Sequence, residues 1–111
     1  MSVPAESGAP LVRPAQPGEA QALYGIDALT AAHPIDLERY QRACTSAGET
    51  GEAALVVVHG PDVVGYVLLQ LVLDEMTILN IAVSPQCQRQ GLGQQLLRAA
   101  MVAARDKGAS R

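Results

Sequence analysis

Three aliphatic runs in the second half of the chain constrain its fold more than any other feature. Residues 53–58, 63–73 and 77–83 are dominated by Val, Leu, Ile and Ala, and only short turn sequences, at 59–62 and 74–75, separate them. Runs of this length and composition predict β-strands, and connections this short predict an antiparallel meander. Because the runs are almost continuously apolar rather than alternating, we expect both faces of the sheet to be covered.

Helical patterns flank these runs on both sides. A short strand at 11–13 precedes helices predicted over 17–31 and 36–47, the second capped by Asp36. After the third aliphatic run, apolar residues recur at helical spacing over 92–104. The predicted fold class is therefore α/β, in the broad sense that includes α+β, with a mostly antiparallel sheet flanked by helices.

Length and composition indicate one small domain with an aliphatic core. The chain has 111 residues, with no Phe, no Trp and three Tyr. Residues 1–10 are rich in small residues and Pro and are predicted to be a flexible tail, which leaves 11–111 as the domain. We find no leader peptide pattern and no apolar stretch of bilayer length, so a cytoplasmic location without a membrane partner is predicted. Cys44 and Cys87 lack metal-ligand spacing, and no metal is expected.

Charge is unevenly distributed along the chain. The formal net charge is −3, which argues against a general nucleic-acid-binding surface. Residues 88–111 nevertheless hold five of the eight Lys and Arg residues and one of the eleven Asp and Glu residues. This basic segment suits a small polyanionic ligand, although a solvated helix face with ordinary Arg residues explains it equally well.

The segment 88–93, Gln-Arg-Gln-Gly-Leu-Gly, connects the third aliphatic run to the last helix. A loop that enters a helix after a buried strand presents free main-chain amides and the positive end of the helix dipole, which together bind anions. Gly91 and Gly93 let an anion approach the main chain, and Arg89 adds a cation. The segment is therefore predicted to bind the phosphates of a cofactor.

Other phosphate-binding motifs fit this segment less well. A dinucleotide fingerprint requires Gly at the position of Leu96, and a Walker loop requires a Lys that does not occur before Lys107. A lone Gly-x-Gly is more often an ordinary helix entry than a ligand site. The spacing Gln-x-x-Gly-x-Gly after the strand sequence ILNIAV is much more specific.

Gln88-x-x-Gly91-x-Gly93, following the segment 80–85 (NIAVSP), resembles the acetyl-CoA signature of the GNAT acetyltransferase superfamily. The longer string LDEMTILNIAVSPQCQRQGLGQQLL, residues 73–97, closely resembles RimI-type members, which acetylate the N-terminal alanine of a small-subunit ribosomal protein. The similarity is dense over about 63–108 and thin before it, although the order of elements agrees throughout.

The resemblance implies a GNAT-like mixed sheet, acetyl-CoA as the cosubstrate, and a ribosomal protein N-terminus as the acceptor. It also implies that main-chain groups of the strand contact the pantetheine arm and the acetyl group, and that amides of the loop surround the pyrophosphate. The implied cofactor-binding residues are Ile81, Ala82, Val83, Arg89, Gln90, Gly91, Leu92, Gly93 and Gln94.

The resemblance also has departures. Ile35 and Cys87 stand where RimI-type chains often have aromatic residues. Cys87 therefore either loosens a wall of the cofactor site or is a small buried thiol. The family's general base and general acid would lie beyond Arg111, so we expect an incomplete GNAT domain without its C-terminal strands, and the catalytic residues stay unassigned. Glu75 either touches the incoming amine or is a solvated turn residue, and Tyr66 is expected in the core or on the sheet.

An open apolar edge at the strand 77–83 would follow from a missing neighbouring strand. The chain is therefore expected either to be part of a longer enzyme or to associate through that edge. The leading functional interpretation is an acetyl-CoA-dependent acetyltransferase acting on protein N-termini. The alternatives are a GNAT enzyme acting on a small-molecule amine and a non-catalytic acyl-CoA-binding module.

Overall fold

The structure is a computed structural model, and its description covers most of the chain. The described residues are 10–31, 34–45, 51–72, 75–87 and 91–106. The predicted N-terminal tail lies outside them, except for its last residue, Pro10.

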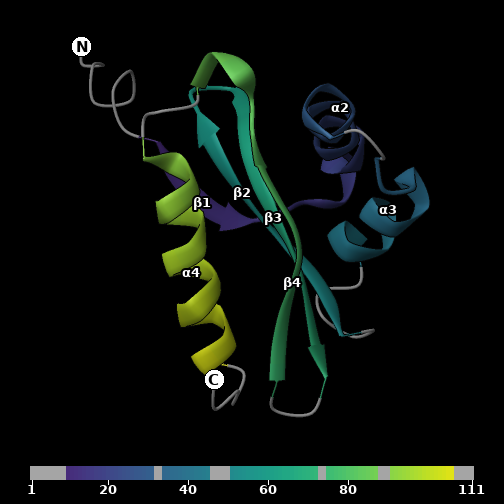
Figure 1. Cartoon of the computed structure of the whole chain (residues 1–111), viewed down its shortest axis with the longest axis vertical. Coiled ribbons are helices and arrows are strands. Elements are labelled where there is room, and N and C mark those ends of the chain that lie inside the picture. Colours follow the sequence, from purple (N-terminus) through teal and green to yellow (C-terminus); the bar gives the residue numbers. More distant parts are fainter. Residues whose placement is uncertain (1–9, 32–33, 46–50, 73–74, 88–90, 107–111) are drawn as a thin grey trace.

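The described residues form one four-stranded antiparallel sheet. Its strands are β1 (Leu11–Pro14), β2 (Glu52–His59), β3 (Asp62–Val72) and β4 (Glu75–Val83), and they lie in the order β1-β2-β3-β4 (Figure 1). The predicted meander is therefore confirmed. Glu75, expected in a turn, instead begins β4 and pairs with Val72.

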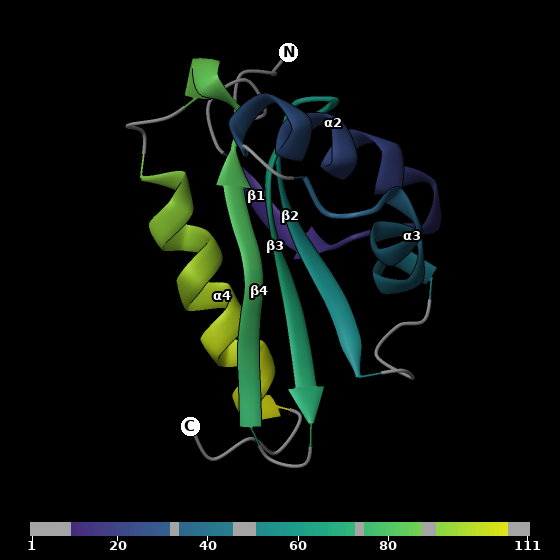
Figure 2. The same cartoon turned by 45° about the vertical axis from the view of Figure 1, so that its right-hand side comes forward.

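Helices cover both faces of the sheet, as the nearly continuous apolar runs predicted. They are η1 (Pro17–Glu19), α2 (Ala20–Thr30), α3 (Leu37–Thr45), η2 (Pro85–Cys87) and α4 (Leu92–Asp106). Figure 2 shows α2 and α3 on one side of the sheet and α4 alone on the other. The main-chain carbonyl of Asp36 accepts hydrogen bonds from Arg39 and Tyr40, which opens the first turn of α3.

Each face of the sheet has its own core. Toward α2 and α3, the buried residues are Ala20, Leu23, Ile26, Tyr40, Ala43, Cys44, Ala54, Val56, Tyr66 and Leu68. Toward α4, they are Leu55, Val57, Val64, Val67, Leu69, Leu92, Leu96 and Ala100. The alternation of side chains along a strand separates the two sets: Leu68 and Tyr66 face one side, and Val67 faces the other.

Two irregularities shape the end of the sheet that is nearest to the start of α4. In β4, Asn80 pairs with Leu68 and Ile78 with Leu69, so Leu79 is an additional residue, a β-bulge. In β3, a second register shift occurs next to Gly65, which pairs with both Val57 and Val83. Bulges bend and twist a strand locally, so the last residues of β4 follow a different course from its beginning.

β4 is the last strand in the described order, and the predicted open edge lies along it. Ile78, with 36% of its surface exposed, is the large apolar side chain on this strand that association would bury. Self-association through β4 stays a prediction. No helix in the described part of the chain combines the length and the apolarity required to cross a bilayer.

Candidate cofactor site between β4 and α4

A pocket of about 560 Å³ lies between the C-terminal half of β4 and the first turns of α4. The C-terminal end of α2 closes a third side. The pocket is lined by Thr30, Ala31, Asn80, Ile81, Ala82, Val83, Gly93, Gln94 and Leu97. α4 runs back alongside β4, so the end of the strand lies near the start of the helix (Figure 1).

Five of the nine residues predicted to bind the cofactor line this pocket. They are Ile81, Ala82, Val83, Gly93 and Gln94. Gly91 and Leu92 lie directly beside it at the start of α4, and the Leu92 side chain is buried in the core between α4 and the sheet. Arg89 and Gln90 lie outside the described residues, so their predicted contacts are not tested.

Gly91 has the backbone conformation that its residue type favours. Its φ is +77°, in the left-handed region where a side chain is strained. Its carbonyl accepts the hydrogen bond from the Gln95 amide, the first bond of the α4 ladder. The amides of Leu92, Gly93 and Gln94 precede this bond and belong to the helix end that attracts anions. The sequence prediction of an anion-binding helix entry is thus consistent with the local geometry.

The outer edge of β4 supplies the other wall of the pocket. Ser84 donates a hydrogen bond of 2.7 Å from its amide to the carbonyl of Val64 on β3. The main-chain N–H and C=O groups alternate in direction along a strand. Those of Ala82 therefore point toward β3, as the Ser84 amide does, and those of Ile81 and Val83 point away from β3. The outward main-chain groups therefore lie on the side of β4 that a peptide-like ligand can approach.

A buried chain of polar side chains lies directly behind this edge. The Tyr40 hydroxyl donates to Asp27 Oδ2 at 2.7 Å and lies 2.7 Å from the Tyr66 hydroxyl. Asn80 Nδ2 donates to the Tyr66 hydroxyl at 2.9 Å and to the Tyr40 hydroxyl at 3.2 Å. Asn80 Oδ1 accepts from the Ile81 amide at 2.9 Å, which links the chain to the pocket wall.

Burial determines the protonation state of the two tyrosines. Loss of solvent, together with the hydrogen bond to Asp27, raises the pKa of Tyr40 to about 12. Burial also raises the pKa of Tyr66, as does its contact with Tyr40. Both side chains therefore remain neutral O–H groups at physiological pH and act as hydrogen-bond partners rather than as bases.

The sequence analysis did not predict these hydrogen-bonded side chains, although two polar residues at apolar positions indicated them. Asn80 is a polar residue inside the aliphatic run 77–83, and Asp27 lies next to Ile26 on the buried face of a helix. Buried polar side chains nearly always have hydrogen-bond partners, so each of these residues required one. Tyr66, expected in the core or on the sheet, is fully buried and is one of those partners.

Two other residues singled out in the sequence lie away from the pocket. Glu75 is exposed at the opposite end of β4, six residues before Ile81, which corresponds to roughly 20 Å along a strand. This position favours the interpretation of Glu75 as a solvated residue. Cys87 is half-buried and packs against the core on the α4 side, which favours the interpretation as a small packed thiol.

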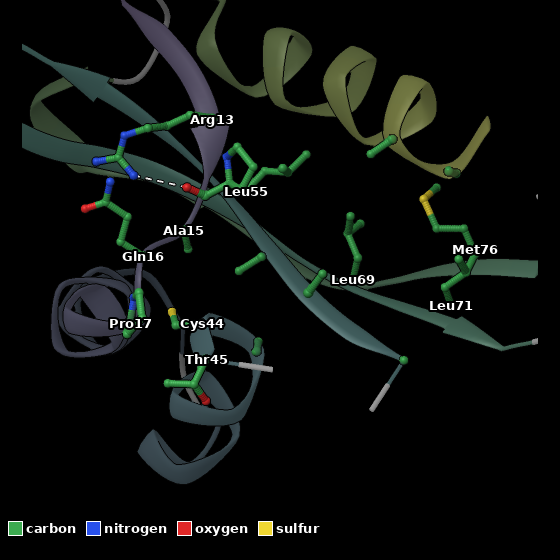
Figure 3. Close-up of a pocket in the computed structure, with 17 residues that line it drawn as sticks. Arg13, Ala15, Gln16, Pro17, Cys44, Thr45, Leu55, Leu69, Leu71 and Met76 are labelled. Atoms are coloured by element: carbon green, nitrogen blue, oxygen red, sulfur yellow. Dashed lines mark hydrogen bonds between the residues drawn. The ribbon is translucent and has the colours of Figure 1, made fainter. Parts of the chain in front are cut away.

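A second, larger cavity of about 670 Å³ lies at the other edge of the sheet, between α3 and α4 (Figure 3). Alanine, leucine and other apolar side chains dominate its lining, and Cys44 lies in its wall. Arg13, at its rim, is paired with Glu19. None of the seven described residues that were predicted to bind the cofactor lines this cavity, so it is not the predicted site.

Known proteins share both the sequence and the fold of this chain. Residues 20–111 match the family described as Acetyltransferase (GNAT) family. The ribosomal protein bS18-alanine N-acetyltransferase of Escherichia coli K12 is 44% identical over 55 residues, which cover 48% of this chain and 37% of that protein. Its crystal structure superposes with a TM-score of 0.77 and 26% identity over 91% of this chain and 63% of the other.

More distant structures share the fold. A GNAT family acetyltransferase from Brucella melitensis, solved in complex with acetyl-CoA, has a TM-score of 0.70 at 17% identity and covers 91% of this chain and 71% of that one. Diaminobutyrate acetyltransferase from Paenibacillus lautus, solved with its substrate and coenzyme A, has a TM-score of 0.70 at 14% identity and covers 84% and 57%. The chain spans less than two thirds of the Escherichia coli enzyme, and within that span it belongs to the GNAT acetyltransferase family.

Proposed function

We propose that this chain binds acetyl-CoA in the pocket between β4 and α4 and serves the transfer of the acetyl group to a protein N-terminal α-amine. The observation that carries the proposal is the shared pocket itself. Main-chain groups of Ile81 and Val83 and the first-turn amides of α4 border one continuous hollow. The matching Escherichia coli enzyme acts on an alanine of a ribosomal protein, and we propose the same class of acceptor, in the cytoplasm.

The walls of the pocket fit the parts of acetyl-CoA. Its pantetheine arm contains amide groups that can pair with the outward main-chain carbonyl of Ile81, as an added strand would. Its pyrophosphate is an anion that suits the amides of Gly93 and Gln94, with Gly91 setting the turn before them. When bound, the group supplies an activated acetyl thioester, and the chain supplies its binding and orientation.

An N-terminal amine suits a site with few titratable groups. Among the described residues that line the pocket, none carries an ionisable side chain. Deprotonation of an α-amine with a pKa of about 7.7–8.0 costs roughly 1 kcal/mol of free energy at pH 7. Deprotonation of a lysine amine with a pKa near 10.4 costs roughly 4.6 kcal/mol. A protein N-terminus therefore depends less on a strong base than a lysine side chain does.

A small-molecule amine is the second candidate for the acceptor. The fold neighbour from Paenibacillus lautus is named for such a substrate, and the identity to the bS18-alanine enzyme is confined to 55 residues. A non-catalytic acyl-CoA-binding module is the third candidate, because the chain spans only part of its relatives. Cofactor binding and acceptor preference separate these candidates.

The first experiment tests the cofactor site by calorimetric titration with acetyl-CoA. Gly93→Glu places a carboxylate at the helix end, and we expect the affinity to fall at least about 100-fold through repulsion of the pyrophosphate, or about 2.7 kcal/mol. Gly25→Glu is the matched control, because both glycines lie in helices with no atom within 4 Å of an added Cβ. Equal affinities of the two variants would refute the site.

The second experiment tests the acceptor. The chain is incubated with acetyl-CoA and either a peptide that begins with Ala, the same peptide with a blocked N-terminus, or diaminobutyrate, and thiol release is followed. Acetylation of the free peptide alone supports the proposal. Preference for diaminobutyrate supports the second candidate, and tight binding without transfer to any amine supports the third.

A further inference from the structure

The buried chain between Asp27 and Ile81 has a single direction of hydrogen-bond donation. Asp27 Oδ2 accepts from the Ile35 amide at 2.8 Å and from the Tyr40 hydroxyl at 2.7 Å. A carboxylate only accepts, so the Tyr40 proton points toward Asp27. In the contact between the two hydroxyls, Tyr66 must therefore donate and Tyr40 accept.

This direction determines the orientation of the Asn80 carboxamide. Tyr40 and Tyr66 have used their protons, so each hydroxyl can only accept from Asn80, and Nδ2 has two protons for this purpose. Oδ1 then points away and accepts from the Ile81 amide at 2.9 Å. The opposite orientation would set Nδ2 against the Ile81 N–H, donor against donor.

The Asn80–Ile81 peptide receives this support on its outward side. It follows directly after the bulge residue Leu79, and the ladder resumes here, with Asn80 opposite Leu68 and Ile81 opposite Val67. Ile81 also lies in the wall of the pocket, with its main-chain groups on the outward side of β4. The ladder holds the side of this peptide that faces β3, and the hydrogen bond from the Ile81 N–H to Asn80 Oδ1 holds its outward side.

We propose that Asn80 is a positioning residue for the cofactor-binding edge of β4. The carboxylate of Asp27 orients its carboxamide through Tyr40 and Tyr66, and Oδ1 holds the Ile81 amide in place. These hydrogen-bonded side chains join α2 and α3 to the pocket wall across the sheet. The inference rests on the proposed binding of acetyl-CoA, and it adds the residues that keep the binding edge ready for that ligand.

The first test measures acetyl-CoA affinity by calorimetry. Asn80→Ala removes the support directly, and we expect the dissociation constant to rise about tenfold, equivalent to about 1.4 kcal/mol. Tyr40→Phe leaves every pocket residue in place but cuts the link to Asp27, and a rise of about threefold or more is expected. Val56→Ala is the control for lost packing, because Val56 lies opposite Tyr66 on β2, is fully buried in the same core and has no polar side-chain atom.

The second test follows the Ile81 amide itself by hydrogen exchange in NMR spectra. Exchange at Ile81 should accelerate about tenfold or more in Asn80→Ala and to a smaller extent in Tyr40→Phe, while Ala82, whose amide faces β3, changes little. A general loss of stability, as in Val56→Ala, would accelerate both amides alike. This readout separates positioning from a purely structural role.

The outcomes distinguish the two proposals. If the unmodified chain does not bind acetyl-CoA, the proposed function fails. If it binds and Asn80→Ala binds equally well or more tightly, the positioning role is overturned, and tighter binding would mean that the carboxamide competes with the ligand for the Ile81 amide. Weaker binding in Asn80→Ala and Tyr40→Phe, with unchanged binding in Val56→Ala, supports the inference.

Discussion

The hydroxyl oxygens of Tyr40 and Tyr66 lie 2.7 Å apart, and the two rings meet edge to face at 84° with 5.4 Å between their centroids. Tyr40 belongs to α3 and Tyr66 to β3, so this contact joins the helical layer to the sheet at a fully buried point. The aromatic pair thus combines apolar packing with a polar link that continues to Asn80 on β4.

Alkaline pH should weaken the fold through Tyr40. Its pKa is raised to about 12 in the folded chain by burial, against 10.0 as the ordinary value. The stabilisation from the neutral hydroxyl is complete below pH 10 and is lost as the pH rises toward 12, because the unfolded chain releases its proton first. The loss in the free energy of unfolding is on the order of 3 kcal/mol.

Urea unfolding at a series of pH values measures this loss. Tyr40→Phe should be less stable than the unmodified chain at neutral pH, and the difference should shrink above pH 10. Tyr24→Phe, at an exposed site on α2, is the matched control for the loss of one tyrosine hydroxyl and should change the stability at neutral pH much less than Tyr40→Phe. An unchanged alkaline slope in Tyr40→Phe would contradict the assignment.

Gly65→Ala should destabilise the sheet at its end nearest the pocket. An added Cβ would lie 2.9 Å from Val57 Cγ1 and 3.1 Å from the carbonyl oxygen of Ala82, and the latter is main chain in the pocket wall. Such overpacking lowers the free energy of unfolding by roughly 1–3 kcal/mol. It should also weaken acetyl-CoA binding by displacing β4. Thermal unfolding and calorimetry measure the two effects.

Gly25→Ala is the matched control for this substitution. It lies in α2 with no atom within 4 Å of an added Cβ, and replacing a helical glycine with alanine stabilises by up to about 1 kcal/mol. The two changes should therefore shift the unfolding temperature in opposite directions. If the Gly65→Ala chain is as stable as the Gly25→Ala chain, the strands around Gly65 have room for a methyl group and the prediction is wrong.

The two cysteines should react at different rates. Burial raises the pKa of the Cys44 thiol to about 11, and its side chain is 4% exposed, whereas Cys87 is half-buried. Because the thiolate is the nucleophile, iodoacetamide at pH 8 should modify Cys87 first and Cys44 only on unfolding. Peptide mass spectrometry over time separates the sites, and early modification of Cys44 would mean that the large cavity opens to reagent.

The ion pair between Arg13 and Glu19 should contribute a small, acid-sensitive stabilisation. Two hydrogen bonds of 2.9 and 2.6 Å join the side chains, and Glu19 also accepts from the Gln16 amide. The bond to Arg13 lowers the pKa of Glu19 below its ordinary value, so the stabilisation is present above that value and is lost as the pH falls through the lowered one.

Glu19→Gln should therefore cost about 0.5–1 kcal/mol at neutral pH, the low value expected for a partly exposed pair. The difference from the unmodified chain should shrink as the pH falls below the ordinary pKa of 4.5 and through the lowered pKa of Glu19. Glu38→Gln, on the exposed side of α3, is the control, and urea unfolding provides the measurement. A difference that persists at low pH would assign the effect to the main-chain contact with Gln16 instead.

The sequence by itself determined the strand meander, the helices on both faces and the glycine at the helix entry. These features depend on local patterns: apolar runs, turn residues and the positive φ of Gly91 are each specified within a few positions. The cofactor residues in β4 came from the family resemblance, and the structure brings Ile81, Ala82 and Val83 together with Gly93 and Gln94 around one pocket.

Only the tertiary structure decided which polar side chains meet. Asp27, Tyr40 and Tyr66 lie 13 and 26 residues apart along the chain, and Tyr40 lies 40 residues from Asn80. No local pattern pairs positions so distant, because their contact depends on the packing of α2 and α3 against the sheet. Burial then makes an unpartnered polar group costly, so the packed fold requires these side chains to bond with one another.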